Sequence, residues 1–279
     1  MAQVFYRLLI VGLLCGVSIT ANLKAADSAA EGSKGHSGRV YSPVEHQDEV
    51  LTAFINKAAE SNKLALLVMG ANWCHDSRGL AKRLNSQQVK DQIEQNYDVL
   101  YIDVGYLSNI KPVITRFGIP VIYATPTVLV LDPKSEKVIN RDNMHIWRSA
   151  GTIGQQQTLD YFNDIAENKA ARLQAVLELD LTSNKDVKRL ITSIDRFELS
   201  QANRLYKAFE IVGPLLQADI EGKEAGKIDE YWRAVSRYRR QLTDDLVLLR
   251  KQVVEFANSG GEENKTLEFP SYTKFEWEK

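Results

Sequence analysis

The chain has 279 residues, of which 44% are hydrophobic and 25% are charged, and its formal net charge at pH 7 is -1. These values are ordinary for a globular protein, and the balanced charge argues against a partner such as nucleic acid that selects a strongly basic chain. The length accommodates one large domain or two modest ones. No stretch after the N-terminal region is apolar for long enough to span a bilayer.

The first 26 residues are typical of a secretory signal. Arg7 provides a short positive region, residues 8–20 form an apolar run, and small residues follow at Ala21 and Ala25, after either of which cleavage is expected. We therefore predict a signal peptide over residues 1–26 and a periplasmic protein. An uncleaved anchor in the inner membrane stays open as the alternative, although the apolar run is short for a span.

The predicted signal peptide determines which cysteines the mature chain retains. Of the two cysteines, Cys15 lies inside the predicted signal, so the mature chain keeps Cys74. A lone cysteine in an oxidising compartment cannot form an intramolecular disulfide. Cys74 is therefore either a buried inert thiol or an exposed thiol that reacts with an outside partner.

Small polar residues predict a flexible linker over residues 27–43. Helical periodicity and short apolar runs then alternate over residues 44–168. In chain order we expect a helix over 44–62, a strand over 64–69, helices over 74–84 and 86–97, a strand over 99–104, a helix over 109–117, strands over 127–131 and 138–140, and a helix from 155. This order predicts an α/β fold with a mixed central sheet flanked by helices.

The remaining residues predict an all-α C-terminal region over 169–259. Gly222 and Gly226 separate two stretches of helical periodicity, which predicts a long antiparallel helical hairpin whose first arm is kinked at Pro214. The stripe beside the main heptad positions is interrupted by Arg239. Such heptads serve packing within the chain or a coiled-coil contact with a partner or a second copy. The polar tail over 260–279 carries scattered aromatic residues, and the sequence leaves open whether it docks on the body.

Cys74 lies where a buried strand gives way to a helix. The run over 64–69 leads through Gly70 into Trp73-Cys74-His75 and the next helix, so Cys74 stands at or next to a helix N-terminus. Unpaired backbone N–H groups and the positive end of the helix dipole favour a thiolate there. Protonated His75 and Arg78 would favour the thiolate further and Asp76 would oppose it, so the sequence leaves the balance open.

The stretch over 71–77, Ala-Asn-Trp-Cys-His-Asp-Ser, resembles the Trp-Cys-x-x-Cys active-site turn of the thioredoxin superfamily. Residues 116–119 and 125–132 resemble the second landmark of that family, in which a cis-proline begins the third sheet strand and faces the active-site cysteine. The resemblance covers residues 44–168 and implies a thioredoxin-like fold. It implies that Cys74 is the attacking cysteine and that Pro126 is the cis-proline.

The same resemblance implies a substrate site around Cys74. Trp73 and His75 would lie beside the thiol, and Thr125 would offer its backbone to an extended substrate peptide. A core-packing role for Trp73 and a trans peptide bond at Pro126 stay open as alternatives.

Several positions depart from the pattern of the family. Ser77 stands where the resolving cysteine would be, so its hydroxyl can donate a hydrogen bond to the Cys74 thiolate but cannot release a mixed disulfide. Val68 and Val99 stand where many thioredoxins keep a buried acid and its lysine partner. We therefore assign catalytic roles to Cys74 and Ser77 only, as a Cys-x-x-Ser protein.

Two functions compete at this stage. The first is monothiol thiol–disulfide exchange through Cys74 with protein or small-molecule thiols and disulfides. The second is a non-catalytic binding or adaptor protein that uses its groove and helical hairpin, and a sensor whose Cys74 is oxidised is a further possibility. Neither a metal nor a cofactor is expected, because Cys74 and His75 are adjacent in the chain and no second Cys–His pair or phosphate-binding loop is visible.

Overall fold

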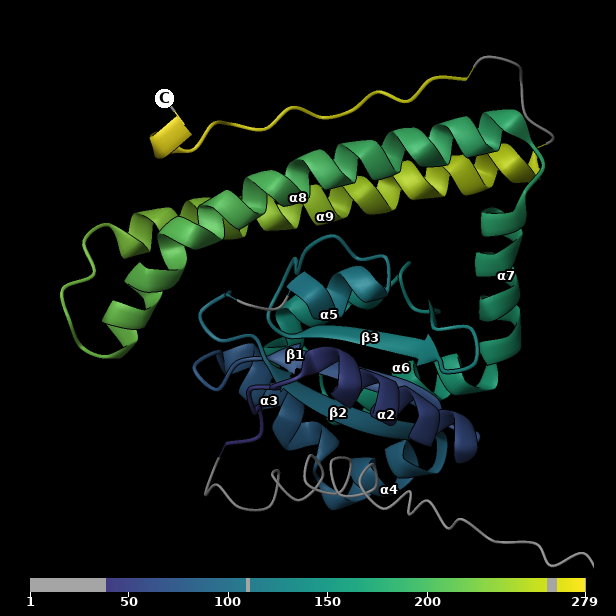
Figure 1. Ribbon diagram of the computed structural model, residues 1–279, viewed down its shortest axis with the longest axis horizontal. Coiled ribbons are helices and arrows are strands. Elements are labelled where there is room, and N and C mark those ends of the chain that lie inside the picture. Colours follow the sequence, from purple (N-terminus) through teal and green to yellow (C-terminus); the bar gives the residue numbers. More distant parts are fainter. Residues whose placement is uncertain (1–38, 109–110, 260–264, 279) are drawn as a thin grey trace, which may run out of the picture.

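The computed structural model describes residues 39–108, 111–259 and 265–278 (Figure 1). The predicted signal peptide over 1–26, with Cys15, and the predicted linker up to residue 38 lie outside the described residues. Within the described ranges, every helix is too short or too polar to cross a membrane.

A mixed sheet of four strands forms the centre of the molecule. Its strands are β1 (Leu64–Gly70), β2 (Tyr97–Asp103), β3 (Thr127–Asp132) and β4 (Lys137–Val138). Their order is β2-β1-β3-β4, with β1 parallel to β2 and antiparallel to β3. Leu66 in the middle of β1 lies opposite Val99 of β2 and Val130 of β3. Every residue of β1 is buried, as a continuous apolar run in a central strand requires.

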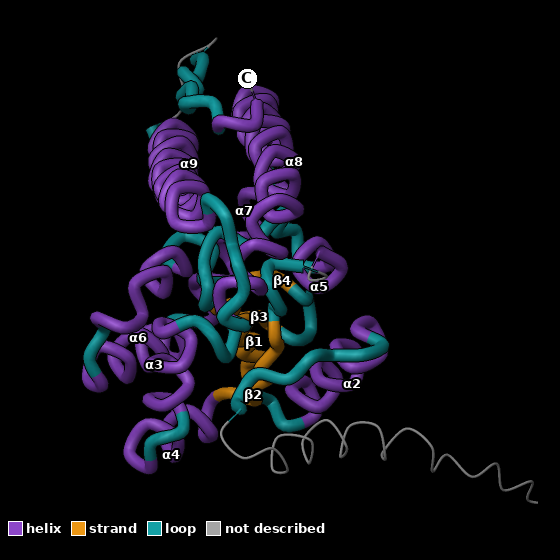
Figure 2. The backbone as a smooth tube through the Cα atoms, turned by 90° about the vertical axis from the view of Figure 1, so that its left-hand side faces the viewer, coloured by secondary structure: helices purple, strands orange, loops and turns teal. Residues whose placement is uncertain are grey.

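Helices cover both faces of the sheet (Figure 2). Ala65 and Leu67 of β1 belong to one hydrophobic cluster, whereas Leu66 and Val68 belong to another on the opposite face. This division follows from the two-residue period of a strand. The first cluster includes residues of α2 (Gln47–Glu60) and α5 (Lys111–Arg116). The second includes residues of α3 (His75–Leu84), α4 (Gln87–Asn96), the 3-10 helix η1 (Met144–Thr152) and α6 (Gln155–Glu167).

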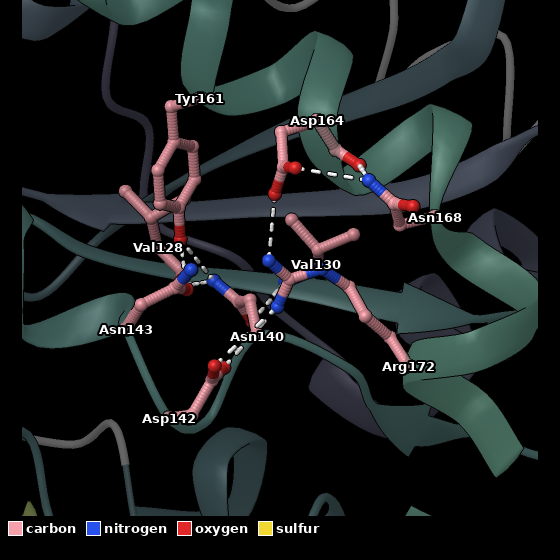
Figure 3. Close-up of polar contacts among 9 residues, drawn as sticks. All are labelled: Val128, Val130, Asn140, Asp142, Asn143, Tyr161, Asp164, Asn168 and Arg172. Carbon is pink, nitrogen blue, oxygen red and sulfur yellow. Dashed lines mark hydrogen bonds and ion pairs between the residues drawn. The ribbon is translucent and has the colours of Figure 1, made fainter. Parts of the chain in front are cut away.

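The chain leaves the sheet earlier than the sequence predicts. The strand expected over 138–140 ends at Val138. Beyond it, the side chain of Asn140 forms hydrogen bonds with the backbone of β3 (Figure 3). Its Oδ1 accepts from the backbone N–H of Val130 at 2.8 Å, and its Nδ2 donates to the carbonyl of Val128 at 3.0 Å. A side-chain amide satisfies a strand edge as a backbone amide would, so the chain is free to turn into η1, which we did not predict.

Three α-helices and a short 3-10 helix complete the fold: α7 (Lys169–Leu181), α8 (Lys185–Ile220), α9 (Ile228–Asn258) and η2 (Glu276–Glu278). Helices α8 and α9 lie side by side above the sheet, and α7 leads up to them along one side (Figure 1). Asn184 caps α8, because its side chain accepts from the backbone N–H of Asp186 and Val187. Buried residues of α8 and α9 belong to the same cluster as the α2 face of the sheet, so the long helices and the sheet share one core.

Helix α8 bends near its C-terminal end, where its last turns leave the direction of the rest of the helix (Figure 1). Pro214 lies within the last seven residues of α8 and removes one hydrogen bond from the helix. The preceding Gly213 is buried, and a Cβ at this position would lie 2.5 Å from the carbonyl oxygen of Tyr106. The backbone of α8 therefore touches the loop that follows β2.

The C-terminal residues dock on the two long helices. Phe275 is buried, with its ring centroid 5.3 Å from that of Tyr238 in α9. The guanidinium of Arg204 in α8 lies 4.5 Å from the ring of Tyr238 and 4.6 Å from that of Phe275, and it also bonds the carboxylate of Glu278 at 2.6 Å. These contacts attach the described tail to both helices.

Two helical glycines allow a direct test of the close approach at α8. In Gly213→Ala the new Cβ collides with the carbonyl of Tyr106, so we expect the free energy of unfolding to fall by about 1–3 kcal/mol. Gly79→Ala in α3 is the matched control, because its Cβ would lie 3.7 Å from the flexible side chain of Arg83 and should add about 0.5–1 kcal/mol through helix propensity. Denaturant unfolding measures both values, and unchanged or higher stability of Gly213→Ala would contradict the contact.

Candidate active site around Cys74

Cys74 is the N-cap residue of α3. Its backbone is extended (φ -80°, ψ 126°), and its carbonyl accepts the first helical hydrogen bond, from Arg78 at 3.0 Å. Two hydrogen bonds between Asn72 and the backbone of Tyr41, at 2.8 and 3.3 Å, hold the turn before it. Cys74 is a free cysteine and is partly exposed. The half-exposed thiol therefore lies at the positive end of a helix of ten residues.

The second predicted motif lies directly against this thiol. The Thr125–Pro126 peptide bond is cis. The thiol of Cys74 donates a hydrogen bond to the carbonyl oxygen of Thr125 at 3.1 Å. Thr125 is 6% exposed, so little of its backbone is open to an extended peptide.

Ser77 lies close to Cys74 in the chain but makes no hydrogen bond with its thiol. It is fully buried, and its carbonyl accepts from the hydroxyl of Tyr41 at 2.8 Å. Its own Oγ has no hydrogen-bond partner among the described residues, and a Cβ on Gly70 would lie 2.8 Å from it. The hydrogen bond that the hydroxyl of Ser77 could donate to Cys74 is not made in this structure, in which the small side chain packs against Gly70 of β1.

Trp73 and His75 both line the pocket beside Cys74 but contact different elements. The indole Nε1 of Trp73 donates to the carbonyl of Gly105 at 2.8 Å, and its ring meets Trp232 of α9 edge to face, with centroids 5.9 Å apart. Trp73 therefore joins the end of β2 to α9. His75 is exposed, and its ring lies against Gly151 of η1, where a Cβ would be 3.1 Å from Nδ1.

The thiol opens into a pocket of about 440 Å³. Cys74, Trp73 and Thr125 form one wall, and residues of η1, α8 and α9 form the others. Sequence reasoning missed the walls contributed by these helices. The residues that it missed include Arg148, Leu216, Asp219, Asp229, Trp232, Arg239 and Arg240.

Arg239 is the unusual member of this lining. It is 7% exposed, and its Nε and Nη1 have no hydrogen-bond partner in the part of the chain that the structure describes. Its guanidinium lies 5.2 Å from the ring centroid of Trp232. Burial lowers the pKa of Arg239 to about 10, against the opposite effect of Cys74, so the side chain still carries its charge at neutral pH. The interruption of an apolar stripe by this arginine was the signal for it in the sequence.

A buried cluster of charges connects the loop before Pro126 to the long helices. Glu198 of α8 is 3% exposed and accepts a hydrogen bond from the hydroxyl of Tyr123 at 2.5 Å. Arg141 pairs with its carboxylate at 2.9 Å, and Arg250 of α9 pairs with it as well. Burial alone would raise the pKa of Glu198, but the two guanidinium groups favour the carboxylate and hold the pKa below its ordinary value.

The donor chemistry of the site gives no sign of a metal centre. Among the described residues, no group of three or more His, Cys, Asp or Glu side chains is arranged to hold a metal ion.

Comparison with known proteins adds one similarity. No protein-family model and no curated protein matches the chain. Among solved structures, it is similar to one described as the crystal structure of disulphide isomerase from Xylella fastidiosa Temecula1, with 25% sequence identity and a TM-score of 0.41. The similarity covers 47% of this chain and 98% of that one. A TM-score of this size carries no conclusion about activity, so the function proposed below rests on the geometry of the site.

The contacts of Glu198 predict that replacing this residue has a strong and pH-dependent effect on the free energy of unfolding. Glu198→Gln removes a buried carboxylate from two partly exposed guanidinium groups, those of Arg141 and Arg250, and leaves Arg250 with Asp195 at 3.6 Å, so we expect the free energy of unfolding at neutral pH to fall by about 1–3 kcal/mol. Because the pKa of Glu198 is lower in the folded state, its contribution is present above the ordinary value of 4.5 and is lost as the pH falls through the folded value.

Denaturant unfolding at several pH values measures this loss, and the gap between wild type and Glu198→Gln should close in acid. Glu136→Gln is the matched control, because Glu136 forms a more exposed pair with Arg116 and should cost about 0–1 kcal/mol. Equal effects of the two substitutions would contradict the role of burial.

Proposed function

We propose that residues 44–168 form a thioredoxin-like domain that carries out monothiol thiol–disulfide exchange through Cys74. The observation that carries this proposal is the placement of the sulfur. It lies at the N-terminus of α3, 3.1 Å from the carbonyl before the cis-proline, and it opens into a pocket. A thiolate is the nucleophile in exchange, and a helix N-terminus favours it.

The exchange has two balanced steps. After the thiol proton passes to solvent, the Cys74 thiolate attacks one sulfur of a disulfide R–S–S–R′, a bond forms to Sγ, and the other sulfur leaves as R′–S⁻. A second thiolate R″–S⁻ then attacks the R sulfur of the mixed disulfide, forms R–S–S–R″ and releases the Cys74 thiolate. One disulfide is consumed and one is formed, so neither step needs an external oxidant or reductant.

Ser77 determines which reactions this cycle suits. A hydroxyl at this position cannot displace the substrate from Cys74, so an outside thiol has to complete each turnover. Isomerisation and transfer of disulfides fit such a cycle, whereas reduction by one molecule of the protein does not. Export to the periplasm is part of the proposal and rests on the sequence of residues 1–26.

A defined small disulfide tests the proposal. We expect the purified protein to form one mixed disulfide with 2-hydroxyethyl disulfide, seen by intact mass, and to lose it on addition of a small thiol. The Cys74→Ser variant should form none. Absence of the adduct at concentrations that modify free cysteine would contradict the proposal and favour a non-catalytic binding protein.

The Ser77→Cys variant tests the missing resolving step. N-cap and N3 side chains lie one turn apart on the same face of a helix, so a cysteine at 77 can reach the mixed disulfide at Cys74. We expect an internal disulfide and a rise of at least roughly tenfold in insulin reduction, because the second thiolate replaces the outside thiol.

An insulin turbidity assay measures this rise, with Ser77→Ala as the control that keeps adduct formation without the gain. Rapid insulin reduction by the wild type, or no gain in a folded Ser77→Cys protein, would contradict the role given to Ser77.

A further inference from the structure

Arg239 is a buried cation that lies over the rings of Trp232 and Phe209, at 5.2 and 5.9 Å, and pairs with no carboxylate among the described residues. Its Nε and Nη1 bond no group within the described ranges, although the side chain is 93% removed from solvent. A buried guanidinium without hydrogen bonds lowers the stability of the folded state. An apolar side chain at position 239 would suit the apolar stripe of α9 better than arginine does. A ligand with hydrogen-bond acceptors would supply the partners that the guanidinium of Arg239 lacks.

The other charges of the pocket are engaged or exposed. Arg148 pairs with Asp244 at 2.6 Å, and the carboxylate of Asp76 accepts from the backbone N–H of Gly151 at 2.5 Å. Arg240 is exposed beside Arg239. Arg239 is thus the cation of the pocket lining that is both buried and short of acceptors.

The charged residues of the lining differ in burial. Asp219 and Asp229 belong to it but are exposed, near the turn that joins α8 to α9, and Arg240 is exposed as well, whereas Arg239 is buried. The buried charge of the lining is therefore positive, and both carboxylates near the helix turn lie toward solvent. A ligand with a carboxylate at one end and an ammonium group at the other matches this arrangement.

The pocket also limits the size of the ligand. The backbone before Pro126 is buried, and Trp232 of α9 packs against Trp73, so the long helices cover the region where an extended protein segment would have to lie. A volume of about 440 Å³ is within the range of small-molecule sites, roughly 300–1,000 Å³.

From these observations we infer that the pocket binds a small peptidic disulfide through a carboxylate held by Arg239, which presents the sulfur of that ligand to Cys74. The inference rests on the proposed exchange function and names its substrate class. The planar fork of a guanidinium binds a carboxylate with two parallel hydrogen bonds, and such bonds are strong where water is excluded. In the first exchange step, Arg239 keeps the ligand carboxylate while the attacked sulfur bonds to Sγ and the other half leaves as a thiolate.

Reaction with two small disulfides tests the inference. Glutathione disulfide carries carboxylates, whereas 2-hydroxyethyl disulfide is neutral. We expect Arg239→Met to slow adduct formation with glutathione disulfide by roughly ten- to hundredfold, as the loss of a charge-assisted hydrogen bond predicts, and to leave the rate with the neutral disulfide within about twofold. Arg237→Met, an exposed position on the same helix outside the pocket lining, should change neither rate.

A second measurement separates binding from exchange. S-methylglutathione has no disulfide, so its affinity, measured by titration calorimetry, does not depend on the reactivity of Cys74. We expect wild type and Arg237→Met to bind it equally and Arg239→Met to bind it roughly ten- to hundredfold more weakly. Arg239→Met should unfold at a temperature no lower than that of the wild type, because the substitution removes a buried unpaired charge.

The outcomes divide clearly. Arg239-dependent binding of S-methylglutathione without any disulfide adduct would overturn the exchange function and leave the ligand site standing. Exchange with both disulfides at rates that Arg239→Met does not alter would overturn the ligand site alone. An equal slowing of both disulfides would also overturn it, because Arg239 would then act on the sulfur of Cys74 rather than on a carboxylate.

Discussion

The buried carboxylate of Glu198 is the interaction on which the arrangement of the molecule depends. It belongs to α8, yet its partners come from the loop before the cis-proline, from the segment after β4 and from α9. Two positive charges and one hydroxyl oriented toward a single carboxylate fix the position of the long helices over the sheet more specifically than apolar contacts do. The loop that carries Thr125 and Pro126 is thereby attached to α8 through Tyr123.

This arrangement places residues of the long helices beside the thiol that follows the central strand β1. Cys74 alone would be a half-exposed thiol at a helix end, with little selectivity among disulfides. Trp232 and Arg239 of α9 add a hydrophobic wall and a fixed positive charge to it. The charge is retained at a cost, since Arg239 lies in a stripe of core residues and its pKa is lowered by burial. A residue that costs stability at one position is the kind that a binding site retains.

Local signals in the sequence were sufficient for much of the sheet and for the placement of Cys74. The apolar run at β1 and the Gly70 that ends it predicted the strand to within one residue. The strand after the turn at residues 133–136 was predicted too long, because the amide of Asn140 imitates backbone pairing and no local pattern reveals this. Arg239 was visible as an interruption of a stripe, but its approach to Cys74 depends on how α9 crosses the sheet, which periodicity does not encode. The packing of Ser77 against Gly70 could not be predicted either, because it depends on how α3 packs on β1.

The late position of α9 in the chain has a consequence for biosynthesis. Ribosomes deliver the first half of the protein, with its thiol, well before the helix that covers that thiol. Until α9 emerges and docks, the nascent polypeptide carries an uncovered nucleophile beside an incomplete core, and contacts between such distant segments form slowly. During that period Cys74 lacks the wall that Trp232 and Arg239 of α9 add to its pocket.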